Sequence, residues 1–492
     1  MKRNKIYSAV AAAAFMLTAT GCSDFTDLQP KGKNLLTTTD QLEMLLNTDQ
    51  GYESGVSSSG TDMRLMSGDI LYAYSNVFTS LAKPNKTRST IIWTWDESMQ
   101  DRMAELTNSD EQYAGYYGII GRICNPIMAR VDEADGPEAT KAQLKAEALT
   151  LRAFYHYLLV NKYCKAYNGT NGDKPGIIYM TEEKDIQTAH EKNTLQECYD
   201  FMLKDVNDAI ALNALQPKGI NAMRIGQSGA YAVKAMILMN MQQWNEAEEA
   251  AKQSIALYGN IANYYDASMT SSTQGMIIGG TYPVIYRGNT GCEEDLYLPS
   301  REIELFNSYN AELWDNMEPG HAFHDRLSVF DMMYDYLMPA GPSLTGLNWQ
   351  ISYDTSSYWN QFGLRTSQMY LVVAEAELHK HNVDAAMEYL DKVREKRINP
   401  DIYQPLKGTV TEEADAIARY KQTARAEEIF TVFGFINYKR WNQVSGWEQT
   451  LVRDFGEGHR YTLSPDSPMW IFPFPTSAVN SNPNLTQNYK EN

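Results

Sequence analysis

Apolar residues recur every three or four positions through much of the chain, which is the spacing of one face of an α-helix. Blocks rich in Ala, Leu, Met, Glu, Lys and Gln are long, whereas alternating runs of Val, Ile and Thr are scarce. This pattern predicts an all-α fold. Two apolar series form a first predicted helix pair: Tyr113, Tyr116, Ile120, Ile123 and Ile127, then Leu144, Ala148, Leu151, Tyr155 and Leu158.

Helix start signals precede two further apolar series. Thr194 with Glu197 three residues later is a capping box, and a cluster of Thr and Asp at 37–40 precedes an apolar helix. Ala-rich helices are predicted near 228–240 and 244–258. We therefore expect the chain to enter its folded body near residue 37.

The Ala-rich block matches a second block when the chain is shifted by 139 residues. Tyr231, Val233, Ala235 and Ala247 then fall on Tyr370, Val372, Ala374 and Ala386 without a gap. Small residues at helix crossings permit close antiparallel packing, as in tetratricopeptide repeats, although two Ala-rich hairpins can also agree by chance. We expect a tetratricopeptide-like scaffold of helical pairs at about 110–258 and 365–442.

Two long stretches, at about 47–108 and 259–364, lack the helical spacing and are rich in Gly, Ser, Thr, Asn, Asp and aromatic residues. Excursions of this length are seldom mere connections, and loops carried by a rigid scaffold are common sites of binding. We expect residues 37–492 to form a single domain with a large, irregular, ligand-binding half.

The first 22 residues have the order of a bacterial lipoprotein signal. Three basic residues precede an apolar stretch at 6–17, which is too short to span a bilayer, and Ala19-Thr20-Gly21-Cys22 follows. This order predicts a signal peptide at 1–21, acylation of Cys22 and an extended tether at 22–36. An ordinary secretory signal cut nearby is the alternative.

The charge balance excludes several classes of partner. Residues 1–21 hold three basic and no acidic residues, so the mature chain has 40 Lys and Arg against 61 Asp and Glu, a net charge of −21. Such a surface repels nucleic acids and anionic headgroups, so contact with the membrane is expected through the lipid alone. It would also disfavour acidic polysaccharides unless a local patch of Lys or Arg, or calcium, offsets the field.

No motif for a metal or a cofactor is convincing, and we expect neither. His321 and His324, like Glu377, His379 and His381, lack the H-E-x-x-H arrangement and are interpreted as solvated loop residues. The acidic run from Cys292 to Asp295 suits either a calcium ion or solvated surface. The other cysteines are interpreted as packing residues whose pairing stays open: Cys124, Cys164, Cys198 and Cys292.

Four stretches together resemble the SusD/RagB family of nutrient-uptake lipoproteins. They lie at residues 145–155, 365–394, 425–441 and 472–488, so that with Cys22 the resemblance spans essentially the whole mature chain. Asn437 and Tyr438 depart from the Gly and Arg that the family usually shows before the tryptophan of its late helix. The hallmark residues Glu375, Arg394, Glu427 and Arg440 are expected to serve the fold through ion pairs.

The resemblance implies a SusD-like, all-helical body with a loop-rich half that holds ligand. It also implies residence at the outer membrane of Bacteroidetes, facing outward, and a TonB-dependent (SusC-like) transporter as partner. The chain would deliver captured oligosaccharide or peptide to that transporter without catalysing a reaction.

Sugar rings stack on Trp and Tyr, and their hydroxyls bond to Asp, Asn or Arg. Two groups of residues combine these types and are expected to converge into one outward-facing cleft. The first is Asp49, Asp69, Tyr72, Tyr74, Trp93 and Trp95; the second is Trp314, Tyr358, Trp359 and Arg365. The alternative is that Trp93 and Trp95 mark a short strand with one indole buried.

Three functional classes therefore remain open. The favoured one is a surface lipoprotein that binds glycan, or less readily peptide, and is not an enzyme. A surface glycoside hydrolase is the second, because two of the many carboxylates could lie at catalytic separation. A tetratricopeptide-type scaffold that binds only proteins is the third.

Overall fold

The computed structural model describes most of the chain beyond its first 35 residues, so Cys22 and the predicted signal lie outside the described residues. The described residues are 36–48, 61–67, 70–71, 86–181, 188–265, 270–274, 281–285, 292–299, 307–310, 316–322, 349–352, 360–429, 431–454 and 458–491.

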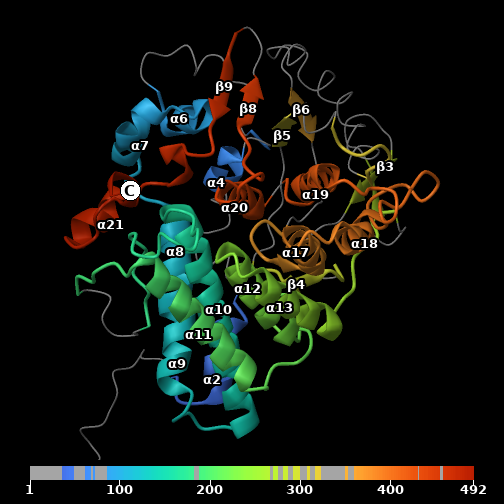
Figure 1. Cartoon of the computed structure of the whole chain (residues 1–492). Coiled ribbons are helices and arrows are strands. Elements are labelled where there is room, and N and C mark those ends of the chain that lie inside the picture. Colours follow the sequence, from blue (N-terminus) through green and yellow to red (C-terminus); the bar gives the residue numbers. More distant parts are fainter. Residues whose placement is uncertain are drawn as a thin grey trace, which may run out of the picture.

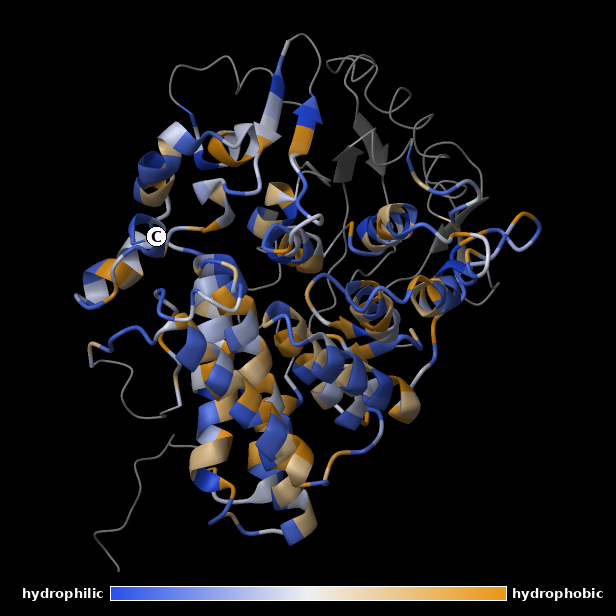
Figure 2. Ribbon diagram, in the orientation of Figure 1, coloured by the Kyte–Doolittle hydropathy of each residue, from blue (hydrophilic) through white to orange (hydrophobic). Residues whose placement is uncertain are grey.

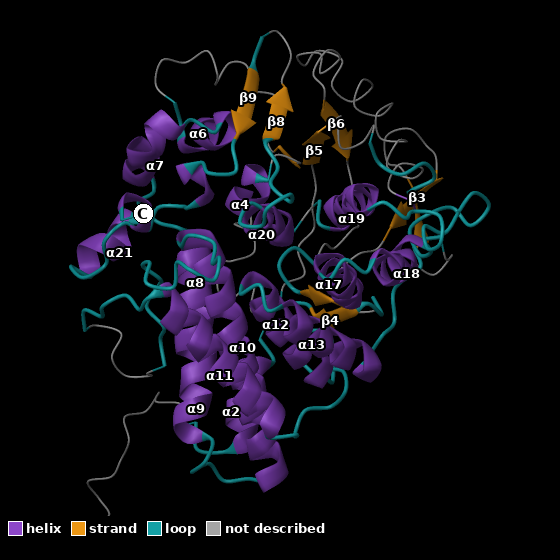
Figure 3. Ribbon diagram, in the orientation of Figure 1, coloured by secondary structure: helices purple, strands orange, loops and turns teal. Residues whose placement is uncertain are grey.

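Helices dominate this structure, which confirms the predicted all-α class (Figures 1 and 3). In the first half they are α2 (Thr39–Leu46), α4 (Thr61–Met66), α6 (Arg88–Thr94), α7 (Gln100–Leu106), α8 (Glu111–Ile119), α9 (Asn125–Arg130), α10 (Glu138–Tyr163) and α11 (Leu195–Ala211). They continue with α12 (Gln227–Asn240), α13 (Trp244–Leu257), α17 (Thr366–His379), α18 (Val383–Arg394), α19 (Glu413–Glu427), α20 (Val432–Trp441) and α21 (Thr476–Ser481). A π-helical segment, Ile120–Cys124, joins α8 to α9. Within the described residues, no helix is both long and apolar enough to cross a membrane.

Both predicted start signals form the bonds expected of them. The backbone N–H of Glu197 donates to the Thr194 hydroxyl at 3.2 Å, and the Thr194 N–H donates back to the Glu197 carboxylate at 2.8 Å. At the start of α2, Thr38 and Gln41 form a similar capping box. Each box satisfies backbone donors that a helix leaves unpaired in its first turn.

The predicted repeat is confirmed helix by helix. α12 and α17 begin and end at positions 139 residues apart, and α13 and α18 begin at the same offset. The alanines of the sequence match are fully buried at the helix crossings: Ala235, Ala247, Ala374 and Ala386. Because α13 also packs against α17, the two pairs form one continuous stack beside α10 and α11 (Figure 1).

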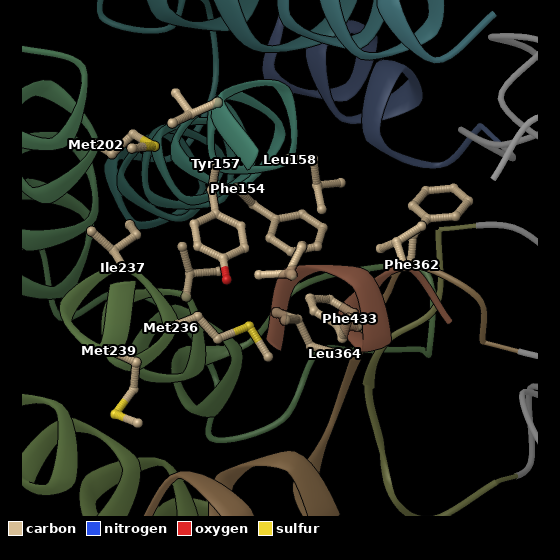
Figure 4. Packing of buried hydrophobic residues seen from close by; sticks show 14 of the residues in the cluster. Phe154, Tyr157, Leu158, Met202, Met236, Ile237, Met239, Phe362, Leu364 and Phe433 are labelled. Carbon is tan, nitrogen blue, oxygen red and sulfur yellow. The ribbon is translucent and has the colours of Figure 1, made fainter. Parts of the chain in front are cut away.

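The core is built on α10, which is buried on most sides in its second half. Figure 4 shows Phe154 and Tyr157 of this helix directed toward Met236 on α12 and Phe433 on α20. Burying one such large side chain stabilises the fold by roughly 1.5–3 kcal/mol. The outer helices carry both hydrophilic and hydrophobic residues (Figure 2), as their amphipathic patterns predict.

Buried ion pairs join helices that are neighbours in space. Arg152 on α10 contacts both carboxylate oxygens of Asp205 on α11, at 2.6 and 2.7 Å. Arg440 on α20 likewise holds both oxygens of Glu375 on α17. With the bonds of Arg394 to Glu318 and of Glu427 to Arg397, these contacts confirm that the hallmark residues serve the fold.

The two regions predicted to be loop-rich contain more regular structure than expected. Residues 61–66 and 88–106 are largely helical, as α4, α6, η2 (Glu97–Met99) and α7. Short antiparallel strands occur in the second region and at the C-terminal end: β2 (Thr270–Gln274), β3 (Thr281–Ile285), β4 (Asp295–Tyr297), β5 (Asn307–Asn310), β6 (Trp349–Ser352), β7 (Leu364–Arg365), β8 (Leu451–Asp454) and β9 (Arg460–Leu463). These strands are so short that the alternation of polar and apolar residues along each of them is not recognisable in the sequence.

One small sheet brings the two loop-rich regions together. β1 (Ile70–Leu71) pairs with β5, and β5 pairs with β6, so the sheet has the order β1-β5-β6. Ile70 lies opposite Tyr309, and Asn310 lies opposite Trp349. The sheet edge near β5 and β6, together with β8 and β9, lies at the end of the molecule away from α2 and α9 (Figure 3).

Candidate ligand-binding site

Most of the aromatic and acidic residues predicted to bind ligand lie outside the described residues. They are Asp49, Asp69, Tyr72, Tyr74, Trp314, Tyr358 and Trp359. Asp69 and Tyr72 flank β1 in the sequence, and Trp314 follows β5 by four residues. The three predicted residues that the structure describes are Trp93, Trp95 and Arg365.

Trp93 and Trp95 are buried in the last turn and at the cap of α6, so they form neither the predicted strand nor a stacking surface. Their side chains are 5% and 3% exposed. Trp95 has a left-handed backbone, φ 47°, and its indole N–H donates to the Met66 carbonyl at 3.2 Å. The guanidinium of Arg453 covers its ring at 4.2 Å from the centroid. Neither indole offers a free face for a sugar, which corrects the expectation for both.

Arg365 is also buried, at 0% exposed, where β7 meets α17. Its guanidinium donates to the Glu428 carboxylate at 2.7 Å and to the Glu427 carbonyl at 3.1 Å. Asp295 lies opposite it in the β4–β7 ladder. Arg365 therefore secures the junction between the long insertion and the scaffold, and its burial offers no contact to a ligand.

A second buried arginine completes this junction. Arg397 donates to Glu294 at 2.7 Å and to Glu427 at 2.6 Å, and its guanidinium lies 3.8 Å from the centroid of the Tyr264 ring. Burial alone would lower the pKa of Arg397, but the two carboxylates hold it well above its ordinary value. Glu294 and Asp295 are fully buried whereas Glu293 is exposed, so only part of the run from Cys292 to Asp295 is solvated surface.

Of the histidines interpreted as solvated loop residues, His321 and His379 are packed against the body, His381 is exposed as expected, and His324 lies outside the described residues. His379 ends α17 and stacks on Trp244 with 3.9 Å between ring centroids, and Trp447 lies 4.4 Å from its other side. His321 is 5% exposed and bridges to Ile398. Among the described residues, no three His, Cys, Asp or Glu side chains are arranged to hold a metal ion.

The four described cysteines are buried free thiols, as their interpretation as packing residues predicts. Burial raises the pKa of Cys124 and of Cys198 to about 12. A thiol with so high a pKa remains protonated and unreactive at neutral pH.

A pocket of about 490 Å³, here named the α19 pocket, lies in the described part of the molecule. This volume is within the range of roughly 300–1,000 Å³ that is usual for small-ligand sites. Most of its wall is one face of α19, and the rest comes from α20, the segment after it and the long insertion. The lining residues are Asn316, Met317, Ala418, Arg419, Lys421, Gln422, Arg425, Ala426, Tyr438 and Gln449.

The α19 pocket is positively charged and rich in amides. Arg419, Lys421 and Arg425 line it, and none of the lining residues that the structure describes is an Asp or a Glu. Gln422 donates to the Asn316 carbonyl, which ties α19 to the insertion. Lys421 lies half-buried, and this burial lowers the pKa of its ammonium, which favours its neutral form.

The sequence interpretation overlooked this pocket. A charge pattern could have indicated it, since three basic residues lie within seven positions of one helix. No local pattern could show that Asn316 and Met317, a hundred residues earlier, form the opposite wall.

Comparison with known proteins supports a single family. A family model described as starch-binding and associating with the outer membrane matches residues 40–239, and the SusD family model matches residues 345–490. No curated protein matches the chain in sequence.

Similar folds occur among solved structures of Bacteroides proteins. A SusD superfamily protein from Bacteroides thetaiotaomicron is 18% identical, with a TM-score of 0.64 over 92% of this chain and 99% of its own. A SusD-like carbohydrate binding protein from Bacteroides vulgatus is 16% identical, with a TM-score of 0.61 over 92% and 98%. Surface glycan-binding protein A from B. thetaiotaomicron, solved with laminarihexaose, is 14% identical, with a TM-score of 0.57 over 92% and 100%.

Proposed function

Because the chain belongs to the SusD/RagB family, we propose that it is a lipoprotein of the outer membrane that binds an oligosaccharide at the cell surface. It passes this nutrient to a TonB-dependent transporter without catalysing a reaction. The match of both halves of the chain to models of this family carries the proposal. The carbohydrate binding stated for two proteins of similar fold favours glycan over peptide.

The small β1-β5-β6 sheet supports a single binding region built from both loop-rich stretches. It joins residues 70–71 to residues 307–310 and 349–352. The strands that are close in sequence to the predicted aromatic residues therefore belong to one sheet. The buried Arg365 and Arg397 secure the same insertion to the helices. A rigid scaffold that holds loops in this way is a common basis for binding sites.

Glycan binding can be tested on the protein purified in detergent with a panel that includes laminarihexaose and maltohexaose. We expect Trp314→Ala and Trp359→Ala each to weaken binding of the best ligand by about tenfold, since stacking on an aromatic ring contributes on the order of 1 kcal/mol or more. Phe201→Ala removes a half-exposed ring from α11 and is the control.

Two results would contradict this proposal. Absence of binding to every glycan in the panel would remove the ligand class, and release of reducing ends from any glycan would indicate the hydrolase instead. Co-purification with a TonB-dependent barrel from the native membrane tests the transporter, and failure of that co-purification would count against delivery.

A further inference from the structure

The α19 pocket combines features that the aromatic loops do not share. Its described lining residues include three with cationic side chains and no Asp or Glu, in a chain whose formal net charge is −18. Elsewhere in the described part, basic residues of the helices commonly meet a carboxylate, as Lys252 and Lys380 both meet Glu248. The described lining of the pocket is thus richer in basic side chains than the chain as a whole.

Two of the pocket cations form no salt bridge with a described residue, although Glu375 and Glu448 act on Lys421 at longer range. The Arg419 side chain is exposed and donates only to the Gln422 amide, at 3.3 Å. The Lys421 ammonium donates to the Trp447 carbonyl and lies 5.4 and 5.6 Å from the ring centroids of Trp441 and Trp447. A half-buried ammonium loses part of its hydration, and an anion in the pocket would compensate it.

The neutral groups of the lining suit a polyhydroxylated ligand. The side-chain amides of Gln422 and Gln449 each offer a donor and an acceptor, and Tyr438, which is 2% exposed, also lines the pocket. Arginine matches the planar carboxylate with two parallel bonds, whereas lysine adds a point charge. Cationic groups beside side-chain amides are the groups that would bind a sugar ring with one carboxylate and several hydroxyls.

We propose that the α19 pocket is a subsite for an acidic sugar, a hexuronate unit within an oligosaccharide. The inference rests on the proposed glycan binding and specifies its substrate class. Arg419 and Lys421 bind the carboxylate, and the neighbouring amides bind ring hydroxyls. The net negative charge of the whole chain does not prevent this, because charges beyond about 8 Å are largely screened at physiological ionic strength.

The test compares trigalacturonate with its fully methyl-esterified form by calorimetry on the detergent-purified protein. The ester replaces each carboxylate with a neutral methyl ester and leaves the ring hydroxyls unchanged, and we expect the acid to bind at least about tenfold more tightly. Raising the salt concentration from 50 to 500 mM should weaken binding of the acid and leave the affinity for the ester unchanged.

Variants connect this difference to the pocket. Arg419→Gln and Lys421→Met should each raise the Kd for trigalacturonate by about tenfold. Lys204→Met and Arg122→Gln remove exposed cations from other helical segments and should have no effect. Arg419 is exposed, so its variant retains the fold even if Lys421→Met lowers stability, and a thermal melt of each variant confirms this.

The outcomes separate this inference from the proposed function. If neutral glycans bind while trigalacturonate does not, or if acid and ester bind equally, the subsite is wrong and the glycan-binding function stands. If no glycan of either kind binds, both are wrong. If triglutamate displaces trigalacturonate with equal affinity, the pocket selects acidic peptide and the sugar assignment is overturned.

Discussion

At the scale of single residues, buried pairs of an arginine and a carboxylate hold neighbouring helices together. Glu375 is fully buried and accepts from Arg440 and from the Tyr420 hydroxyl. Burial alone would raise the pKa of Glu375, but Arg440 holds it below its usual range. The pair is therefore ionised, and each partner compensates the desolvation of the other.

Replacing one member of this pair should destabilise the protein strongly. We expect Glu375→Gln to lower the free energy of unfolding by about 3–5 kcal/mol, because it leaves Arg440 charged and buried without a counterion. The double variant Glu375→Met with Arg440→Met should recover much of that loss. Urea unfolding measures both, and Asp208→Asn, which breaks an exposed pair with Lys204, should cost at most about 1 kcal/mol. Equal loss in the single and double variants would count against the ion pair.

Lys439 makes a distinct prediction, because it is buried without a carboxylate partner among the residues that the structure describes. Its ammonium donates to the carbonyls of Asn161 and Cys164 at 2.7 and 2.6 Å, and burial lowers its pKa to about 7. An unfolded lysine titrates near 10.4, so between about pH 7 and pH 10 the unfolded chain binds more protons than the folded one.

The stability should therefore rise with pH across this window. For Lys439 alone the slope should approach about 1.4 kcal/mol per pH unit and vanish below pH 7, where both states are protonated. Lys439→Met should remove this slope, as measured by denaturant unfolding at several pH values. Parallel pH profiles of parent and variant would show that Lys439 is charged in the folded state.

At the scale of elements, the two helical pairs share the geometry of their turns. Gln242 between α12 and α13 and His381 between α17 and α18 both have φ 59°, in the left-handed region, and they lie 139 residues apart. The repeat seen in the sequence is thus a repeat of the backbone as well. A side chain in this conformation costs roughly 1 kcal/mol relative to glycine.

This shared strain can be measured at both turns. Gln242→Gly and His381→Gly should each leave stability unchanged or raise it by up to about 1 kcal/mol. The neighbours Gln243 and Asn382 have φ −91° and −102°, so Gln243→Gly and Asn382→Gly should instead lower stability by about 0.5–1 kcal/mol. Thermal melts compare the four variants, and equal effects within a turn would contradict the explanation.

At the scale of the whole molecule, the helices and the loop-rich stretches have different roles. The stack from α12 to α18 packs beside α10, whereas the small sheet of β1, β5 and β6 joins stretches more than two hundred residues apart. In our proposal the stack provides rigidity and the joined stretches hold the glycan. In the same proposal, the lipid keeps this assembly at the mouth of the transporter.

Removing the lipid tests this division. Cys22→Ala should leave glycan affinity in solution unchanged, because the acylation site precedes the folded body, and should impair uptake of the glycan by cells. Calorimetry and growth on that glycan measure the two effects, with Cys292→Ala as a control that leaves the lipid in place. Normal uptake by Cys22→Ala cells would show that contact with the transporter alone retains the protein.

Much of the helical scaffold could be predicted from the sequence, because it depends on residues close together in the chain. The capping box at Thr194 is a local pattern, and the 139-residue offset between Ala235 and Ala374 relates two such patterns. The structure reproduces both. Helical spacing and caps act over one or two turns, so the printed sequence contains them in full.

Tertiary structure alone decided which polar and aromatic residues are buried. Trp93, Trp95 and Arg365 have the composition of a binding site, yet distant segments cover them, through Arg453 for Trp95 and Glu428 for Arg365. For the α19 pocket the reverse holds. Its cationic residues can be seen in the sequence, but the cavity that they line cannot. Burial is a property of segments that meet in space, and a tryptophan or an arginine has the same local signature on a surface as in a core.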